Sequence, residues 1–302
     1  MATRQVLIYY KSCSARARAL ADDYQSFFAA QLGVAHVCLV PSDPDREPDI
    51  AAMRSWLQQV ENVNESECLV IGGDGSINIA AQVFAETPVI ISVIPAGTGN
   101  DFATALAIKD PLWRRQGTTE TSARSIGKIG EYYFINHAGT GISVALQRLQ
   151  SDFTKRWLGR SSYLLALLRY LFTRPSRRCR IINHDLELEF QVVTVNKAIG
   201  GGIVVYPEAQ REQQILGYLA VPKLPRLKQL NALYWLLRRQ PKRSAIIVAA
   251  EADSFTIGDI DNSIELDGDS IPLTGPAEAR IVRAGLTVRH PQWCCSQPAN
   301  SK

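Results

Sequence analysis

The first third of the chain alternates short, continuous apolar runs with longer segments in which apolar residues recur every three or four positions. The apolar runs predict buried strands at residues 5–10, 34–40, 68–71 and 89–94. The periodic segments predict helices at residues 14–31, 49–60 and 77–84. Ser14 and Asp49 are expected to be N-caps, and Gly33 a helix stop. Buried strands joined by helices predict a doubly wound parallel α/β sheet.

The pattern changes near residue 132, where strand-like segments begin to dominate. They lie at residues 132–136, 186–195, 245–249, 254–257 and 264–266. Strand-rich sequence with two helical interruptions predicts a second, mostly antiparallel domain. We therefore expect an α/β domain over residues 1–130 and a β-rich domain over residues 131–285.

Two glycine-rich segments each follow a predicted strand and open a predicted helix. They are GGDGSIN at residues 72–78 and PAGTGNDFA at residues 95–103. Glycines at such a turn let backbone N–H groups approach a phosphate at the positive end of a helix. Asp74 is unusual in an anion site unless it binds a metal or orients a hydroxyl, so the combination points to a nucleotide with its cation.

Either turn taken alone could instead be a plain chain reversal that binds no ligand. Their spacing fits neither the dinucleotide-binding fingerprint nor the P-loop. Two such turns on successive parallel strands would, however, lie side by side at the carboxyl edge of the sheet, where open α/β folds bind ligands.

Length and composition add limits on the class of protein. A chain of 302 residues with 46% hydrophobic content can bury one large or two medium cores. The start of the chain runs directly into a strand pattern, so we expect no signal peptide. The apolar run at residues 163–168 stops at Arg169, far short of a membrane-spanning helix. The six cysteines show no C-x-x-C spacing, which favours free thiols in the cytoplasm.

Positive charge is concentrated in one region. Residues 151–245 contain 17 Lys and Arg against 6 Asp and Glu, a net charge of +11. Two apolar segments there, at residues 157–172 and 224–237, run into basic clusters. Such segments predict peripheral binding to an anionic membrane surface, and a core helix with a solvated basic end is an equal alternative. No nucleic-acid motif accompanies them, so a nucleic-acid partner is not expected.

The paired GGDGSIN and PAGTGNDFA segments resemble the signature of the diacylglycerol kinase catalytic-domain family, which includes soluble bacterial lipid kinases and the sphingosine kinases. Further along, residues 133–136 with Gly139 and Gly141 resemble the entry to the family's second domain. Residues 266–269 resemble its catalytic Asp-Gly-Glu. The resemblance implies a β-sandwich second domain, a carboxyl-terminal segment 286–302 that joins the first domain, and a nucleotide cleft between the two domains.

The activity implied by this resemblance is transfer of the γ-phosphoryl group of ATP, with Mg²⁺, to a lipid hydroxyl. Asp269 occupies the general-base position, and Asp74 would coordinate the metal or its water. The remaining implied nucleotide-binding residues are Gly72, Gly73, Gly75, Ser76, Asn78, Gly97, Thr98, Asn100 and Asp101. An isolated Asp-Gly-Asp would otherwise be read as a plain hairpin turn.

Four positions depart from the family pattern. Asp269 replaces a glutamate, residues 10–14 replace an Asn-Pro-x-Ser-Gly run, and Ser125 replaces an aspartate. Leu216 replaces the aspartate of a segment that supplies a structural metal site, so we expect that site to be absent.

These departures leave a second reading open, a nucleotide-binding pseudokinase. A soluble-metabolite kinase of the NAD kinase type shares GGDG but is disfavoured by PAGTGNDFA. The sequence determines neither the lipid nor the oligomeric state.

Overall fold

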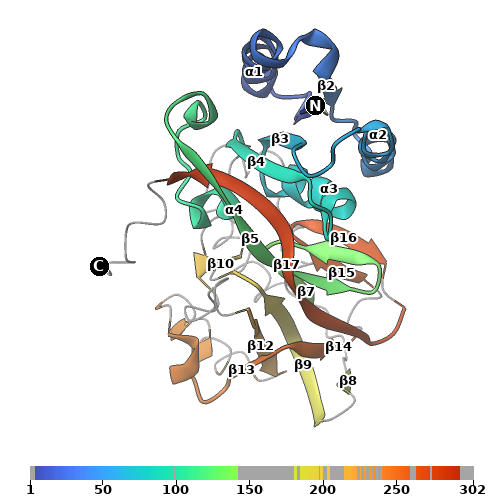
Figure 1. Cartoon of the computed structure of the whole chain (residues 1–302). Helices are drawn as coiled ribbons and strands as arrows, with labels where there is room; N and C mark the ends of the chain where they lie inside the picture. The colour runs from blue at the N-terminus through green and yellow to red at the C-terminus, as the bar shows by residue number, and fades with distance from the viewer. Residues whose placement is uncertain are drawn as a thin grey trace. The chain divides into compact units, whose positions relative to one another are not determined.

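The computed structural model describes the chain in two compact units. The described residues are 4–97, 100–141, 180–181, 184–196, 198–199, 203–204, 214–222, 225, 228, 231–232, 234–235, 238, 240–258, 263–272 and 274–292. The first unit combines Met1–Arg124 with Arg283–Lys302, and the second is Ser125–Val282 (Figure 1). The two long strands β5 (Thr119–Ile129) and β17 (Ala277–Pro291) each run from one unit into the other.

The first unit is built on a parallel sheet. Its strands β1 (Val6–Tyr10), β2 (Val37–Pro41), β3 (Glu67–Gly72) and β4 (Ile90–Pro95) lie in the order β2-β1-β3-β4, followed by β17 and β5. The residues of β3 and β4 are all buried, as expected for central strands of a parallel sheet covered by helices. The connecting helices are α1 (Ala15–Leu32), α2 (Arg46–Gln59) and α3 (Asp74–Phe84), with the short α4 (Asp101–Ala105) after β4. The predicted doubly wound α/β architecture is confirmed.

Local capping signals were informative at α1 and misleading at α2. Ser14 is the N-cap of α1 and its hydroxyl accepts from the Ala17 N–H, while Gly33 ends that helix at φ 88°. The predicted N-cap Asp49 is wrong, because α2 begins at Arg46 with Asp45 in the cap position. Asp49 is instead buried, and its carboxylate accepts from the Tyr9 hydroxyl at 2.6 Å and the Asp43 N–H at 2.8 Å.

Two short 3₁₀ helices also belong to this unit, at Val34–His36 and Trp113–Arg115. The first one corrects the predicted strand at residues 34–40, since the strand starts only at Val37.

The second unit contains an antiparallel sheet in the order β13-β12-β9-β7-β15-β16. These strands are β13 (Val248–Ala252), β12 (Leu216–Pro222), β9 (His184–Thr194), β7 (His137–Gly141), β15 (Ser263–Leu266) and β16 (Asp269–Pro272). This unit also contains the short strands β8 (Arg180–Ile181), β10 (Ala198–Ile199) and β11 (Ile203–Val204) and the 3₁₀ helix Pro241–Arg243.

A second layer in this unit comes from β6 (Tyr132–Phe134), which pairs with β5, and β14 (Ser254–Ile257), which pairs with β17. Phe134, Ile257 and Ile281 from this layer share one buried cluster with Val193, Leu216 and Leu266 from the antiparallel sheet. Two layers of strands therefore enclose a common core, and the predicted β-sandwich is confirmed.

Several strands were not predicted from the pattern. The 15-residue β17 and the 11-residue β5 carry many charged and polar residues, so neither reads as an apolar run. The predicted basic segment 157–172 lies outside the described residues, as does most of 224–237. Among the described residues, no helix has the length and apolar character needed to cross a membrane.

Candidate active site

The two glycine-rich turns leave the sheet side by side. β3 and β4 are parallel neighbours with Gly72 opposite Pro95, and the Ala96 N–H donates to the Gly72 carbonyl at 2.9 Å. A Cβ added to Gly97 would lie 2.5 Å from the Cα of Gly73, and one added to Gly73 would lie 3.2 Å from the Cα of Gly97. The turns thus pack backbone against backbone, which requires glycine at residue 97 and leaves little room for a side chain at residue 73.

Asp74 joins the first turn to the helix that follows the second. One carboxylate oxygen accepts from the Asp101 N–H at 2.9 Å and the other from the Phe102 N–H at 2.8 Å. These are the first residues of α4, whose N–H groups lack helical partners. Asp74 therefore has a structural contact that the sequence did not reveal. Carboxylate oxygens carry further lone pairs, so this contact leaves metal or water coordination open.

Asn100 holds the second turn from within. Its side-chain oxygen accepts from the Gly97 N–H at 3.0 Å, and its side-chain nitrogen donates to the Gly97 carbonyl at 2.8 Å. Its backbone is left-handed at φ 53°, a conformation that asparagine tolerates better than most residues. Thr98 lies outside the described residues.

The start of α3 is arranged to receive an anion. Gly73 is its N-cap, and no side chain of the described residues caps this end of the 11-residue helix. Apart from its chain neighbours and the backbone of α3 itself, a Cβ added to Gly75 would find no atom of the described residues within 4 Å, whereas one on Gly72 would collide with Ser76. The open position at Gly75 and the dipole of α3 fit a phosphate at this turn.

Asn78 and Asp101 are buried rather than presented at the turns. The side-chain oxygen of Asn78 accepts from Gln82 at 3.1 Å and from the Arg46 guanidinium at 3.4 Å. Arg46, at the start of α2, is thus a basic side chain near α3 that the sequence analysis did not single out.

The predicted base, Asp269, follows a tight turn in the second unit. β15 and β16 pair with Leu266 opposite Asp269, which leaves Asp267 and Gly268 as a two-residue loop. Both loop residues have positive φ, 51° and 106°, as in a type I′ hairpin. Asp269 is the first residue of β16 and is partly exposed.

Asp267 anchors this turn to a second predicted motif. Its carboxylate accepts the backbone N–H groups of Ile135, Asn136 and His137 at 2.6, 2.8 and 2.9 Å. The structure therefore brings residues 133–137 and 266–269 together within the second unit, although about 130 positions separate them in the chain.

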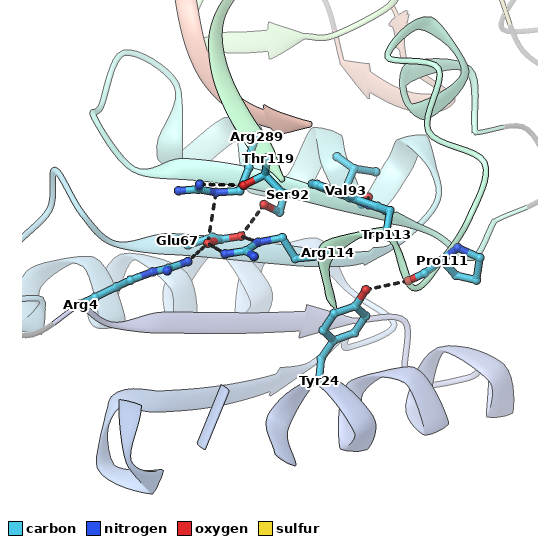
Figure 2. A network of polar contacts seen from close by, with 10 residues as sticks. All are labelled: Arg4, Tyr24, Glu67, Ser92, Val93, Pro111, Trp113, Arg114, Thr119 and Arg289. Atoms are coloured by element: carbon cyan, nitrogen blue, oxygen red, sulfur yellow. Dashed lines mark hydrogen bonds and ion pairs between the residues drawn. The ribbon is translucent and has the colours of Figure 1, made fainter. Parts of the chain in front are cut away.

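A charged network around Glu67 was not predicted (Figure 2). The carboxylate of this fully buried residue accepts two hydrogen bonds from Arg114, at 2.8 and 2.9 Å. Arg4 and Ser92 also donate to it, and the Nε of Arg289 lies 3.5 Å away. Burial alone would raise the pKa of Glu67, but hydrogen bonds and charge from Arg114, with the charges of Arg4 and Arg289, lower it to about 2.

The described residues contain no group of three or more His, Cys, Asp or Glu side chains that could hold a metal.

The fold of this chain is similar to that of solved diacylglycerol kinases. A solved diacylglycerol kinase structure from Bacillus anthracis aligns over 96% of this chain and 98% of its own, with a TM-score of 0.70 at 16% identity. The fold is thus that of a diacylglycerol kinase-like α/β protein. Residues 6–128 match the family model of the diacylglycerol kinase catalytic domain. The matched residues include both glycine-rich turns, whereas Asp269 lies beyond them.

Two relatives of this chain are named as lipid kinases. A protein named probable lipid kinase YegS-like, from Pectobacterium atrosepticum, is 26% identical over 259 residues, which cover 80% of this chain and 83% of that protein. A diacylglycerol kinase from Mycobacterium tuberculosis is 28% identical over 240 residues, covering 74% of this chain and 76% of its own.

Proposed function

We propose that this protein is an ATP-dependent lipid kinase that phosphorylates the hydroxyl group of a diacylglycerol-type or sphingoid-type lipid. The observation that carries the proposal is the pair of interlocked glycine turns at one edge of the sheet, inside the part of the chain that matches the family model. The names of the relatives supply the lipid class of the acceptor.

The first turn supplies the phosphate site. Backbone N–H groups of residues 73–76 at the start of α3 would bind the phosphates of ATP, and Gly75 leaves room for them. Gly97, Asn100 and Asp74 keep the two turns in register, so the site is organised before the nucleotide arrives. Mg²⁺, when bound, would neutralise charge on the transferred group, with Asp74 as its protein ligand or as a ligand of its water.

Asp269 is the proposed general base. Its carboxylate would accept the proton of the lipid hydroxyl while the hydroxyl oxygen attacks the γ-phosphorus and ADP leaves. Asp267 fixes the turn that carries Asp269 through three backbone N–H groups. Asp267 is buried whereas Asp269 is partly exposed, so Asp269 is the better placed of the two to act as base.

We also propose that the protein collects its lipid at an anionic membrane surface facing the cytoplasm. Tyr234 is 49% exposed, with the guanidinium of Arg238 5.5 Å from its ring centroid. Trp235 packs against Tyr234 at 5.2 Å and has Arg243 at 5.9 Å. An exposed tyrosine and a partly buried tryptophan with arginines beside them suit a lipid interface.

Phosphate transfer from labelled ATP into a total lipid extract tests the activity. We expect one labelled lipid class, to be identified by mass spectrometry, and no label with an Asp269→Asn variant. Tight ATP binding without any labelled lipid would instead support the pseudokinase reading. Transfer to NAD and not to lipid would support the soluble-metabolite alternative.

A further inference from the structure

Beside the turn that carries Asp269 lies a buried pair, His137 and Glu265, which the proposed mechanism has not used. The Nε2 of His137 lies 3.0 Å from one carboxylate oxygen of Glu265. The other oxygen accepts the backbone N–H of Gly268. Glu265 is only 4% exposed and His137 only 6%, so both polar groups depend on partners inside the protein.

Both central residues of the turn, Asp267 and Gly268, are restrained by hydrogen bonds. Asp267 is held through its carboxylate by the N–H groups of residues 135–137, and its own N–H donates to the His137 carbonyl at 3.1 Å. Gly268 is held through its N–H by Glu265. His137 therefore supports Asp267 with its backbone and Glu265 with its side chain.

The turn needs such support because both of its residues have positive φ. Asp267 at φ 51° is a non-glycine residue in the left-handed region, which is less favourable than an ordinary conformation. A hydrogen bond to an ionised carboxylate is stronger than one between neutral groups. The contact from Glu265 to Gly268 thus restrains the residue directly before Asp269.

We infer that Glu265 and His137 are positioning residues for the reaction: Glu265 fixes Gly268, and through it the carboxylate of Asp269, while His137 orients Glu265. The inference rests on the proposed role of Asp269 as base. It predicts that loss of Glu265 impairs the chemical step more than substrate binding, because a base displaced by about 1 Å can lose on the order of 100-fold in rate.

The test compares Glu265→Ala, Glu265→Gln and Thr140→Val in the full chain. Glutamine keeps an oxygen that can accept from Gly268, whereas alanine removes it. Thr140 is the matched control, because it is fully buried on the same strand as His137, and its hydroxyl contacts the Gly258 carbonyl and Gln191 rather than the turn. We expect kcat to fall about 100-fold in Glu265→Ala, with ATP affinity unchanged. Glu265→Gln should recover most of this loss, and Thr140→Val should stay near wild type.

Amide hydrogen exchange gives a second readout that needs no activity. The Gly268 N–H should exchange about tenfold faster in Glu265→Ala, as expected for loss of one hydrogen bond, and at the wild-type rate in Thr140→Val. Unchanged Gly268 exchange in Glu265→Ala, or an equal loss of kcat in Thr140→Val, would overturn the inference. Absence of lipid phosphorylation by the wild-type chain, with Gly268 still released in Glu265→Ala, would overturn the proposed function instead.

Discussion

Gly75 is the glycine of the first turn that the fold itself does not explain. A Cβ at Gly97 would strike the backbone of Gly73, but a Cβ at Gly75 would enter space that no described neighbour fills. The backbone of Gly75 is helical and has no positive φ, so other residues can adopt it. In the proposed function, the lack of a side chain at this position lets a phosphate of ATP approach closely.

Gly75→Val should lower ATP affinity at least about tenfold and leave the melting temperature nearly unchanged, because its side chain would reach into the proposed phosphate position from a Cβ that meets no packed neighbour among the described residues. Calorimetry with ATP and a thermal melt of the same sample measure both. Gly97→Ala is the contrasting variant and should lower the melting temperature, since its Cβ would lie 2.5 Å from Gly73. Wild-type ATP affinity in Gly75→Val would remove this turn from the nucleotide site.

Variants of Asp269 distinguish an active lipid kinase from a nucleotide-binding pseudokinase. Asp269→Asn should nearly abolish lipid phosphorylation and leave ATP affinity unchanged, because the lost contact matters chiefly in the transition state. Asp269→Glu, longer by about 1.5 Å, should slow an enzyme adapted to aspartate and could restore a decayed one. Steady-state kinetics of both variants measure these effects on turnover. Wild-type turnover in Asp269→Asn would mean that another residue is the base.

At the scale of elements, Glu67 connects segments that are distant in the chain. It is the first residue of β3, and its partners come from the segment before β1, from β4, from the 3₁₀ helix Trp113–Arg115 and from β17. Nearby, the Trp113 indole donates to the Val93 carbonyl at 2.9 Å and the Tyr24 hydroxyl to the Pro111 carbonyl at 2.8 Å (Figure 2). The carboxylate thus ties β17 and the segment after α4 to the centre of the first unit.

The lowered pKa of Glu67 predicts acid-sensitive stability. Its folded pKa of about 2 lies below the ordinary glutamate value of about 4.3, so the ionised carboxylate stabilises the fold above pH ~4.3 and this stabilisation is lost as the pH falls towards 2. The difference corresponds to on the order of 3 kcal/mol. Denaturant unfolding between pH 7 and pH 2.5 should therefore show a steeper fall in stability for the wild type than for Glu67→Gln.

Glu67→Gln should itself be less stable at pH 7 by about 3–5 kcal/mol, because it leaves the guanidinium groups without their buried counter-charge. Ser92→Ala is a milder companion, since it removes one neutral donor to the same carboxylate. A stability difference between wild type and Glu67→Gln that stays constant with pH would contradict the assigned pKa.

At the scale of the whole molecule, the distribution of charge predicts an interaction with membranes. The net charge of +11 over residues 151–245 predicts binding to anionic vesicles that weakens with salt, because exposed charges more than about 8 Å apart are screened at physiological ionic strength. Sedimentation with anionic and neutral vesicles at two salt concentrations measures this. Equal binding to both vesicle types would remove the electrostatic part of the membrane proposal.

Local sequence was enough for the features that depend on neighbours in the chain. The apolar runs located β1, β3 and β4 to within about two residues, because a strand buried on both faces has little room for polar residues. The glycine-rich turns after β3 and β4 were likewise readable, since a left-handed or crowded backbone position favours a small set of residues. The order of these elements was sufficient to predict the α/β sheet and a second, mostly antiparallel domain, whereas the sandwich was predicted from the family resemblance.

Tertiary structure alone decided the long-range partners of the charged groups. Asp74 binds N–H groups 27 and 28 positions away, and Asp267 binds N–H groups about 130 positions away. Arg114 and Arg289 meet at Glu67, and His137 meets Glu265, with no periodic signal in the chain to mark them. The apolar residues of one helix or strand face recur at regular positions in the sequence, because they all face the same core. A buried charge needs only one partner of suitable geometry, and that partner can come from any segment that the fold brings within about 3 Å.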